Sequence, residues 1–157
     1  MRDETSWRRM RWWQRLRRDR RGNAAIELAL LAAPLVLMTV GTADYGFAVY
    51  QQMEVQNAAQ AGAEYARKHG FSTTGITNAV AAATPLQVTA TPAPAESCGC
   101  PSGTTISPAT CGSTCAGAQA AGVYVTVGAQ AVYTTIVPYP GIPSSFTLAA
   151  SSTVRIQ

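Results

Sequence analysis

Apolar residues form one long run near the amino end of the chain. From Asn23 to Val40 there are 18 residues, and Glu27 is the only charged one among them. A run of this length reaches the lower limit for a transmembrane helix. Pro34 is compatible with such a helix, because neighbouring groups in membrane proteins satisfy the carbonyl that a proline leaves free, although a kink is expected there.

The next segment is polar enough for water and still helical in its pattern. A stripe of mostly small side chains recurs at helical spacing: Ala48, Val55, Ala59, Gly62 and Ala66. Lys68 and His69 fall in the expected last turn, where cations suit the helix dipole, and Gly70 is a suitable C-cap. The sequence therefore predicts one helix of about 70 Å over residues 23–69. We expect a transmembrane half over residues 23–43 and a soluble half over residues 44–70.

Beyond residue 70 the pattern changes to alternation. A short second helix is expected around Asn78–Ala82. Three segments alternate as strands do: 86–96, which its prolines stop, 122–140 and 146–157. The Cys-, Gly-, Ser- and Pro-rich residues 97–116 predict a loop, and residues 138–143 a turn. The fold class is thus α+β: a long N-terminal transmembrane helix extends into a small domain, residues 71–157, with two to four antiparallel strands.

Charge is distributed unevenly along the chain. Residues 1–22 hold nine arginines against three acidic residues, whereas the remainder is mildly acidic. Such asymmetry points to nucleic acid or to a membrane surface. Trp7, Trp12 and Trp13 favour lipid headgroups over RNA, because aromatic rings and basic side chains both settle at that level. We interpret residues 1–22 as a basic leader that stays in the cytoplasm, following the positive-inside rule.

Four cysteines, Cys98, Cys100, Cys111 and Cys115, all lie beyond the apolar run. An even number in an oxidising compartment predicts two disulfides. The close spacing disfavours a Cys98–Cys100 bond, so the bridges are expected between the two cysteine pairs, with the connectivity open. Free thiols and a zinc site are the alternatives, although the spacing misses the usual C-x2-C pairs and no histidine lies nearby.

The sequence gives no sign of catalysis. His69 is the only histidine, and we interpret it as a helix-end residue. No nucleophile–base set and no pair of carboxylates can be assembled, and no glycine-rich phosphate loop is present. We therefore expect no enzyme activity, no cofactor and no metal.

A basic leader ending in Gly22, then Asn23 and an apolar helix with Glu27 at its fifth residue, resembles the class III signal of type IV pilin-like proteins. The continuation "GNAAIELALLAAPL", then "GTADYGFAVYQQMEVQNAAQAGAEYAR", resembles the TadE family of minor pilins or pseudopilins of tight-adherence (Flp-type) pili. The resemblance covers residues 22–70 and is looser beyond them. Leu28 stands where the family usually has an aromatic residue, and Pro34 lies one residue further from the glutamate than is common.

The resemblance implies how these residues are used. A prepilin peptidase would cut between Gly22 and Asn23, and Glu27 would pair with the new amine of a neighbouring subunit as a register key. A carboxylate near the bilayer centre costs roughly 2.5–3.5 kcal/mol, less near the helix end, and pairing offsets that cost. The implied partners are the peptidase, other pilins, the pilus assembly platform and membrane lipid, without nucleic acid.

The implied location is the bacterial inner membrane. The protein would cross it once, with its N-terminus in the cytoplasm and its C-terminal domain in the periplasm, and whether it enters the surface fibre or stays at its base is open. Function would be structural: assembly of the pilus through packing of the N-terminal helix.

Several alternatives stay open. Gly22 and Glu27 can coincide by chance, with the glutamate reaching back to the membrane surface. The apolar run can be a secretory signal cleaved after Ala43, and Arg8–Arg9 weakly resembles a twin-arginine signal. In function, the rivals are an unprocessed, membrane-anchored periplasmic scaffold or binding protein that recognises a partner through its cysteine-rich loop, and an accessory subunit that tethers an enzyme.

Overall fold

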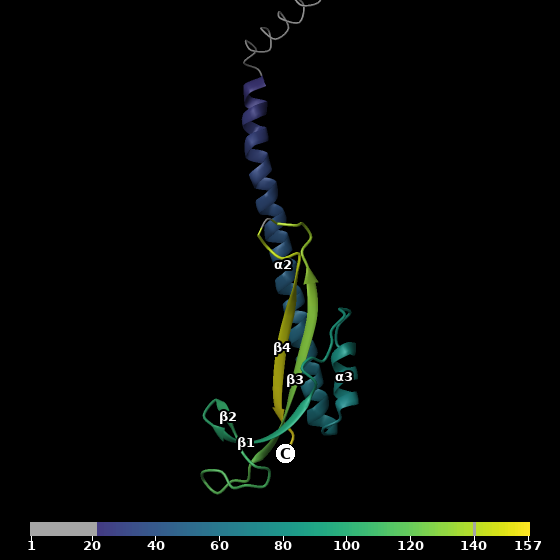
Figure 1. Ribbon diagram of the computed structural model, residues 1–157, viewed down its shortest axis with the longest axis vertical. Coiled ribbons are helices and arrows are strands. Elements are labelled where there is room, and N and C mark those ends of the chain that lie inside the picture. Colours follow the sequence, from purple (N-terminus) through teal and green to yellow (C-terminus); the bar gives the residue numbers. More distant parts are fainter. Residues whose placement is uncertain (1–21, 140) are drawn as a thin grey trace, which may run out of the picture. The chain divides into compact units, whose positions relative to one another are not determined.

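The computed structural model describes residues 22–139 and 141–157. Its elements follow the order α2 (Asn23–His69), α3 (Thr73–Ala82), β1 (Ala95–Ser102), β2 (Thr105–Pro108), β3 (Gly122–Thr134) and β4 (Ser145–Arg155) (Figure 1). This confirms the predicted α+β class, with a long apolar helix followed by a small antiparallel sheet. The predicted basic leader, apart from Gly22, lies outside the described residues.

Helix α2 has the predicted bounds. Pro34 lies inside it, and the helix continues past the proline. At the other end, Arg67, Lys68 and His69 occupy the last turn. Gly70 then takes a left-handed conformation, φ +80°, and its N–H donates to the Ala66 carbonyl at 2.8 Å. This is the glycine C-cap that the sequence predicts, because a residue without Cβ adopts this conformation at little cost.

Internal contacts divide the chain into two compact units between Ala43 and Asp44, within α2. In the first unit the large apolar side chains from Ile26 to Met38 are exposed. Among the described residues, α2 is the one helix whose length and composition allow it to cross a membrane. A cleaved signal sequence can have the same length and composition. The helix is therefore a candidate membrane anchor.

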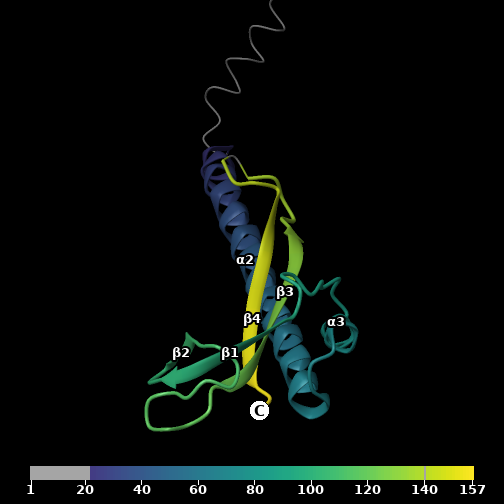
Figure 2. The same ribbon diagram turned by 60° about the horizontal axis from the view of Figure 1, so that its bottom comes forward.

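In the second unit, four antiparallel strands form one sheet in the order β2-β1-β3-β4. Strands β3 and β4 pair over their whole shared length, from Tyr124↔Arg155 to Thr134↔Ser145. Strand β1 pairs with the beginning of β3 and extends to one side with β2 (Figure 2). The two-to-four-strand prediction is therefore confirmed at its upper limit.

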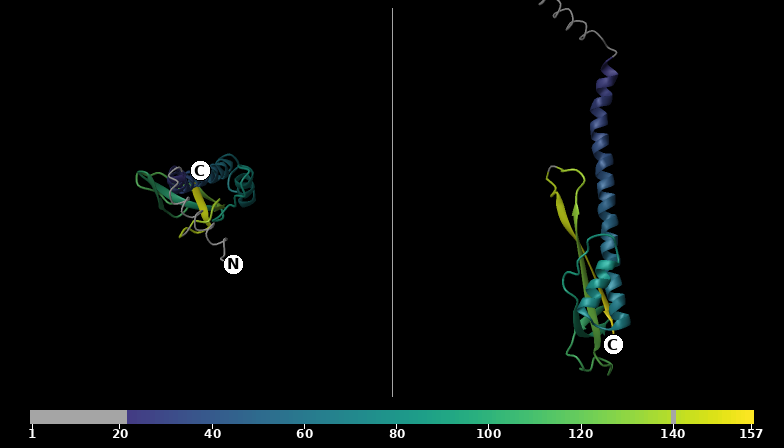
Figure 3. Two further views of the ribbon diagram at one scale, coloured as in Figure 1. Left: turned by 90° about the horizontal axis from the view of Figure 1, so that it is seen from above. Right: turned by 90° about the vertical axis from the view of Figure 1, so that its right-hand side faces the viewer.

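The core lies between the helices and the β3–β4 ladder, which form two layers (Figure 3, right). The predicted stripe on α2 faces this core: Val55, Ala59, Gly62 and Ala66 are buried, and Ala48 is partly buried. A Cβ at Gly62 would lie 2.6 Å from Val80 Cγ2 and 2.8 Å from Val127 Cγ1. The small side chains therefore let the helix backbone approach α3 and β3 closely.

Three local predictions need correction. The predicted loop over residues 97–116 is wrong in its first part, because β1 and β2 occupy most of residues 95–108. The hydrogen-bond partners of β1 lie on β3, and the composition of the segment gives no sign of them. The predicted strand 86–96 is reduced to an isolated bridge at Thr89 before β1 begins. Helix α3 exists but starts earlier than expected, because Ser72 caps it and accepts from the Gly75 N–H at 3.3 Å.

Candidate functional site

The predicted processing segment lies at the start of α2. Gly22 is exposed and directly precedes Asn23, the first residue of the α-helix α2. A Cβ built on Gly22 would meet nothing within 4 Å. Within the part of the chain that the structure describes, no packing contact therefore requires a glycine at this position.

Glu27 lies four residues after Asn23, about one helical turn further along. Its side chain is exposed, and so are those of Ile26 and Leu28 on either side. The glutamate thus stands on a surface that is otherwise apolar. In lipid a charge in such a setting is costly and is normally paired with another group.

A second acidic residue, Asp44, is one that sequence reasoning left without a role. It is 5% exposed, and its carboxylate is held by the end of the β3–β4 hairpin. Tyr133 Oη donates to Asp44 Oδ1 and to the Asp44 carbonyl, the latter at 2.9 Å. The Ile136 N–H donates to the same Oδ1 at 3.3 Å. These partners are 89 and 92 residues away in the chain, so no local pattern could have indicated them.

Two tyrosines near this carboxylate have raised pKa values. Burial raises the pKa of Tyr133 to about 12, and the hydrogen bond to the Asp44 carboxylate adds to the effect. Burial also raises the pKa of Tyr139, and the negative charge of Asp44 again contributes. Within the described residues the buried Tyr139 Oη has no hydrogen-bond partner. Tyr133 therefore stays a protonated donor at any physiological pH.

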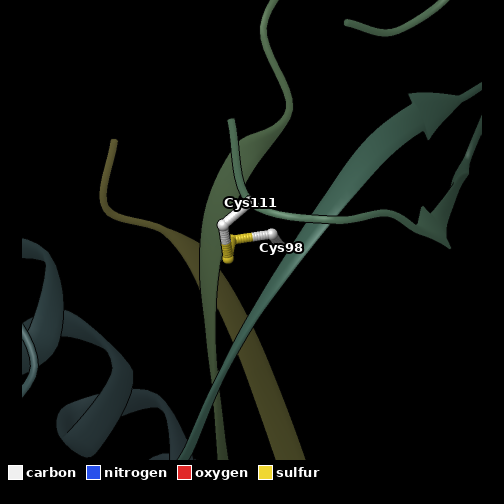
Figure 4. Close-up of a disulfide and its surroundings, with 2 residues drawn as sticks. All are labelled: Cys98 and Cys111. Carbon is white, nitrogen blue, oxygen red and sulfur yellow. A yellow bond between two sulfur atoms is a disulfide. The ribbon is translucent and has the colours of Figure 1, made fainter. Parts of the chain in front are cut away.

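The cysteines form two disulfides, Cys98–Cys111 and Cys100–Cys115, with Cα–Cα distances of 5.1 and 5.6 Å. Figure 4 shows the first, which joins β1 to the segment after β2. Both bridges run between the two predicted pairs. All four sulfurs are thereby engaged, which excludes the free-thiol and zinc alternatives.

The disulfides hold a part of the molecule that has almost no core. We name residues 98–121 the disulfide-bonded lobe. Apart from Cys98 and Gly99, every residue of the lobe is exposed or only partly buried. The hydrophobic core draws its members from α2, α3, Val88, β3 and β4, and from none of the lobe. The bridges therefore take the place of buried apolar side chains here.

The end of α2 carries a cluster of charges that is structural in character. Arg67 binds Glu64 through Nη2 at 2.6 Å and Nε at 2.8 Å, and Lys68 Nζ lies 3.2 Å from the same carboxylate. Hydrogen bonds from these cations lower the pKa of Glu64 to about 2. His69 stacks on Tyr65, with ring centroids 4.5 Å apart, as suits the predicted helix-end residue.

The long helix begins with an exposed apolar part and continues into a small unit that contains a sheet. This arrangement is typical of a protein attached to a membrane by a single helix at one end. Within that class, the family model described as TadE-like protein matches residues 22–64, which confirms the resemblance found in the sequence. The family is structural and associated with the tight-adherence pilus. No curated protein and no solved structure matches the chain.

Proposed function

We propose that this protein is a minor pilin or pseudopilin that helps to assemble a tight-adherence type IV pilus. The observation that carries the proposal is the coincidence of two borders: the TadE-like match begins at Gly22, and α2 begins at Asn23. A leader that ends at Gly22 would put the cleavage site directly before this helix. The basic leader would remain in the cytoplasm, and the peptidase would remove it there.

Cleavage between Gly22 and Asn23 would create a new α-amine at the first residue of the helix. Such an amine has a pKa near 7.7–8.0 and is largely protonated at neutral pH. Glu27 lies one turn from it. In lipid, a carboxylate is costly until it meets a cation, so the Glu27 carboxylate would favour the one helix alignment that brings it to the amine of a neighbouring subunit.

The same helix offers a surface for lateral packing. Small side chains recur along its first third: Ala24, Ala25, Ala29, Ala32 and Ala33. Small residues let helices approach closely in lipid, where hydrophobicity alone does not drive association. In this arrangement the second unit would face the periplasm, a compartment in which disulfides form and persist.

The direct test is the mass and N-terminal sequence of the protein extracted from membranes of cells with and without the peptidase. A start at Asn23 that depends on the peptidase supports the proposal. A Met1 start in cells that have the peptidase overturns processing, and an Asp44 start indicates a secreted domain instead.

Two glycines provide a matched pair of variants for this test. Gly22→Val should block cleavage, because a branched side chain obstructs an extended backbone in a narrow active site. Gly46→Val is the control, since a Cβ at Gly46, like one at Gly22, meets nothing within 4 Å. Cleavage of both variants at the normal rate would contradict recognition of Gly22 by the peptidase.

A second candidate function is an unprocessed, membrane-anchored scaffold or binding protein. The disulfide-bonded lobe favours it, because the lobe is exposed and rigidly closed and lies outside the family match. The same experiment separates the two candidates, since this one requires the intact Met1 start.

A further inference from the structure

The end of the β3–β4 hairpin carries exposed apolar side chains. Ile136, Ile142 and Phe146 are 58, 55 and 40% exposed, and we call them the hairpin-end patch. Turns in water are normally polar. Contiguous exposed apolar surface usually marks a place where a protein binds a partner or a membrane.

The hairpin itself carries no charged side chain between the patch and Val154, and the carboxylate next to it, that of Asp44, is bound by hydrogen bonds. From Ser97 to Val154 the sequence contains no Asp, Glu, Lys or Arg. No charged side chain of the hairpin therefore stands in the way of transfer from water to a less polar medium. Charged groups carry by far the largest penalty for such a transfer.

The patch is attached to the point where the candidate anchor ends. The Ile136 N–H and the Tyr133 hydroxyl both bind Asp44, the first residue of the second unit. Asp44 follows Val40, the last residue of the apolar run, by four positions, about 6 Å along a helix. The hydrogen bonds thus join the hairpin end to a residue that follows the apolar run by only four positions in the chain.

Aromatic side chains gather at the same end of the second unit. Tyr45, Phe47 and Tyr50 follow Asp44 on α2 and are all mostly exposed. Phe146 stacks at a tilt on Tyr133, with ring centroids 5.2 Å apart. Aromatic rings, tyrosine above all, are enriched where membrane proteins pass through the headgroup region.

We propose that the hairpin-end patch is a second membrane contact, lying in the headgroup region of the bilayer that α2 crosses. Ile136 and Ile142 enter the boundary between headgroups and acyl chains, and Asp44 holds the turn in place. This inference rests on the membrane anchor of the proposed function. It is independent of cleavage and of pilus assembly, so lipid alone suffices as the partner.

The experiment uses the full chain in vesicles of a phosphatidylethanolamine–phosphatidylglycerol mixture, with one added cysteine carrying the polarity-sensitive dye NBD. Ile142→Cys reports on the patch. Thr104→Cys, on the exposed turn between β1 and β2 at the opposite end of the ladder (Figure 1), is the matched control. Leu35→Cys reports on the anchor. The four native cysteines are bonded to each other, so only the added thiol reacts.

We expect the dye at residue 142 to show blue-shifted emission and quenching by lipids labelled near the headgroup. At residue 104 the emission should stay water-like and unquenched. If residue 35 is in lipid but residue 142 matches residue 104, the inference is wrong and a protein partner covers the patch. If residue 35 itself is in water, both the inference and the proposed anchor fail.

Discussion

The two parts of α2 on either side of Asp44 are built for different surroundings. Before it, the exposed side chains are large and apolar, as at Leu30, Leu35 and Met38. After it, most of the apolar residues that pack in the core are small, and they are buried against α3 and the sheet, as at Ala59 and Ala66. Large apolar side chains can face a medium that adapts to them, whereas the small ones of the second part let the helix come close to a fixed protein surface.

The same small-to-large substitution on the two sides should give the sharpest contrast. Ala59→Leu adds three carbons at a site that is 1% exposed, and overpacking should lower the free energy of unfolding of the second unit by about 3 kcal/mol. Ala33→Leu should leave that unfolding unchanged. Urea titration of the detergent-solubilised protein, followed by tyrosine circular dichroism, measures both. Equal effects would mean that the two parts do not differ in this way.

The acidic residue of each part offers the next contrast. Asp44→Ala removes the acceptor of the Ile136 N–H and one acceptor of Tyr133, and should cost about 2 kcal/mol in the unfolding of the second unit. Glu27→Ala should leave this unfolding and membrane insertion intact, and should instead reduce co-purification with other pilins. A normal yield of co-purified pilins from Glu27→Ala would count against the register key.

High pH should weaken only the second unit. The pKa of Tyr133 is raised from 10.0 to about 12 in the folded protein. A raised pKa means that the stabilisation is complete below pH 10 and is lost as the pH rises towards 12. Tyr133→Phe should lack this component of the pH dependence. Tyrosinate absorbance during a pH titration measures it, and a Tyr133 that ionises together with the exposed tyrosines would refute the expectation.

The smallest effect is expected at the exposed face of the second part. Glu64→Gln should leave the free energy of unfolding almost unchanged, because the bridges to Arg67 and Lys68 are open to solvent and screened by salt. The lowered pKa of Glu64 means that this contribution exists above pH 4.5 and disappears as the pH falls through about 2. Thermal unfolding of wild type and variant at the two ends of this range measures it.

The extent of the long helix and its buried face could be predicted from the sequence. The ends of α2 follow from the apolar run after Gly22 and from the glycine C-cap at Gly70, and the buried stripe follows from its helical spacing. Two disulfides between the cysteine pairs could be predicted because the cysteines lie on the expected oxidising side of the membrane, and because Cys98 and Cys100 are too close in the sequence to bond to each other.

What could not be predicted depends on contacts between distant segments. The partners of Asp44 lie on a hairpin end about ninety residues away, so nothing near residue 44 reveals them. Strand β1 has the composition of a loop and becomes a strand because it pairs with β3, from Ala95↔Thr126 to Gly99↔Gly122. In both cases pairing with a distant segment decides the structure, and local preference does not.

The disulfide-bonded lobe has a consequence for how this protein can diverge. Its shape is held by two disulfides and by backbone hydrogen bonds such as those of the β1–β2 pair, so the side chains between the cysteines contribute little packing. Exchanging the whole segment between Cys100 and Cys111 for another of equal length should leave the helices and the β3–β4 ladder undisturbed. Relatives facing different environments are expected to differ first at this site, while the interior of the second unit stays the same.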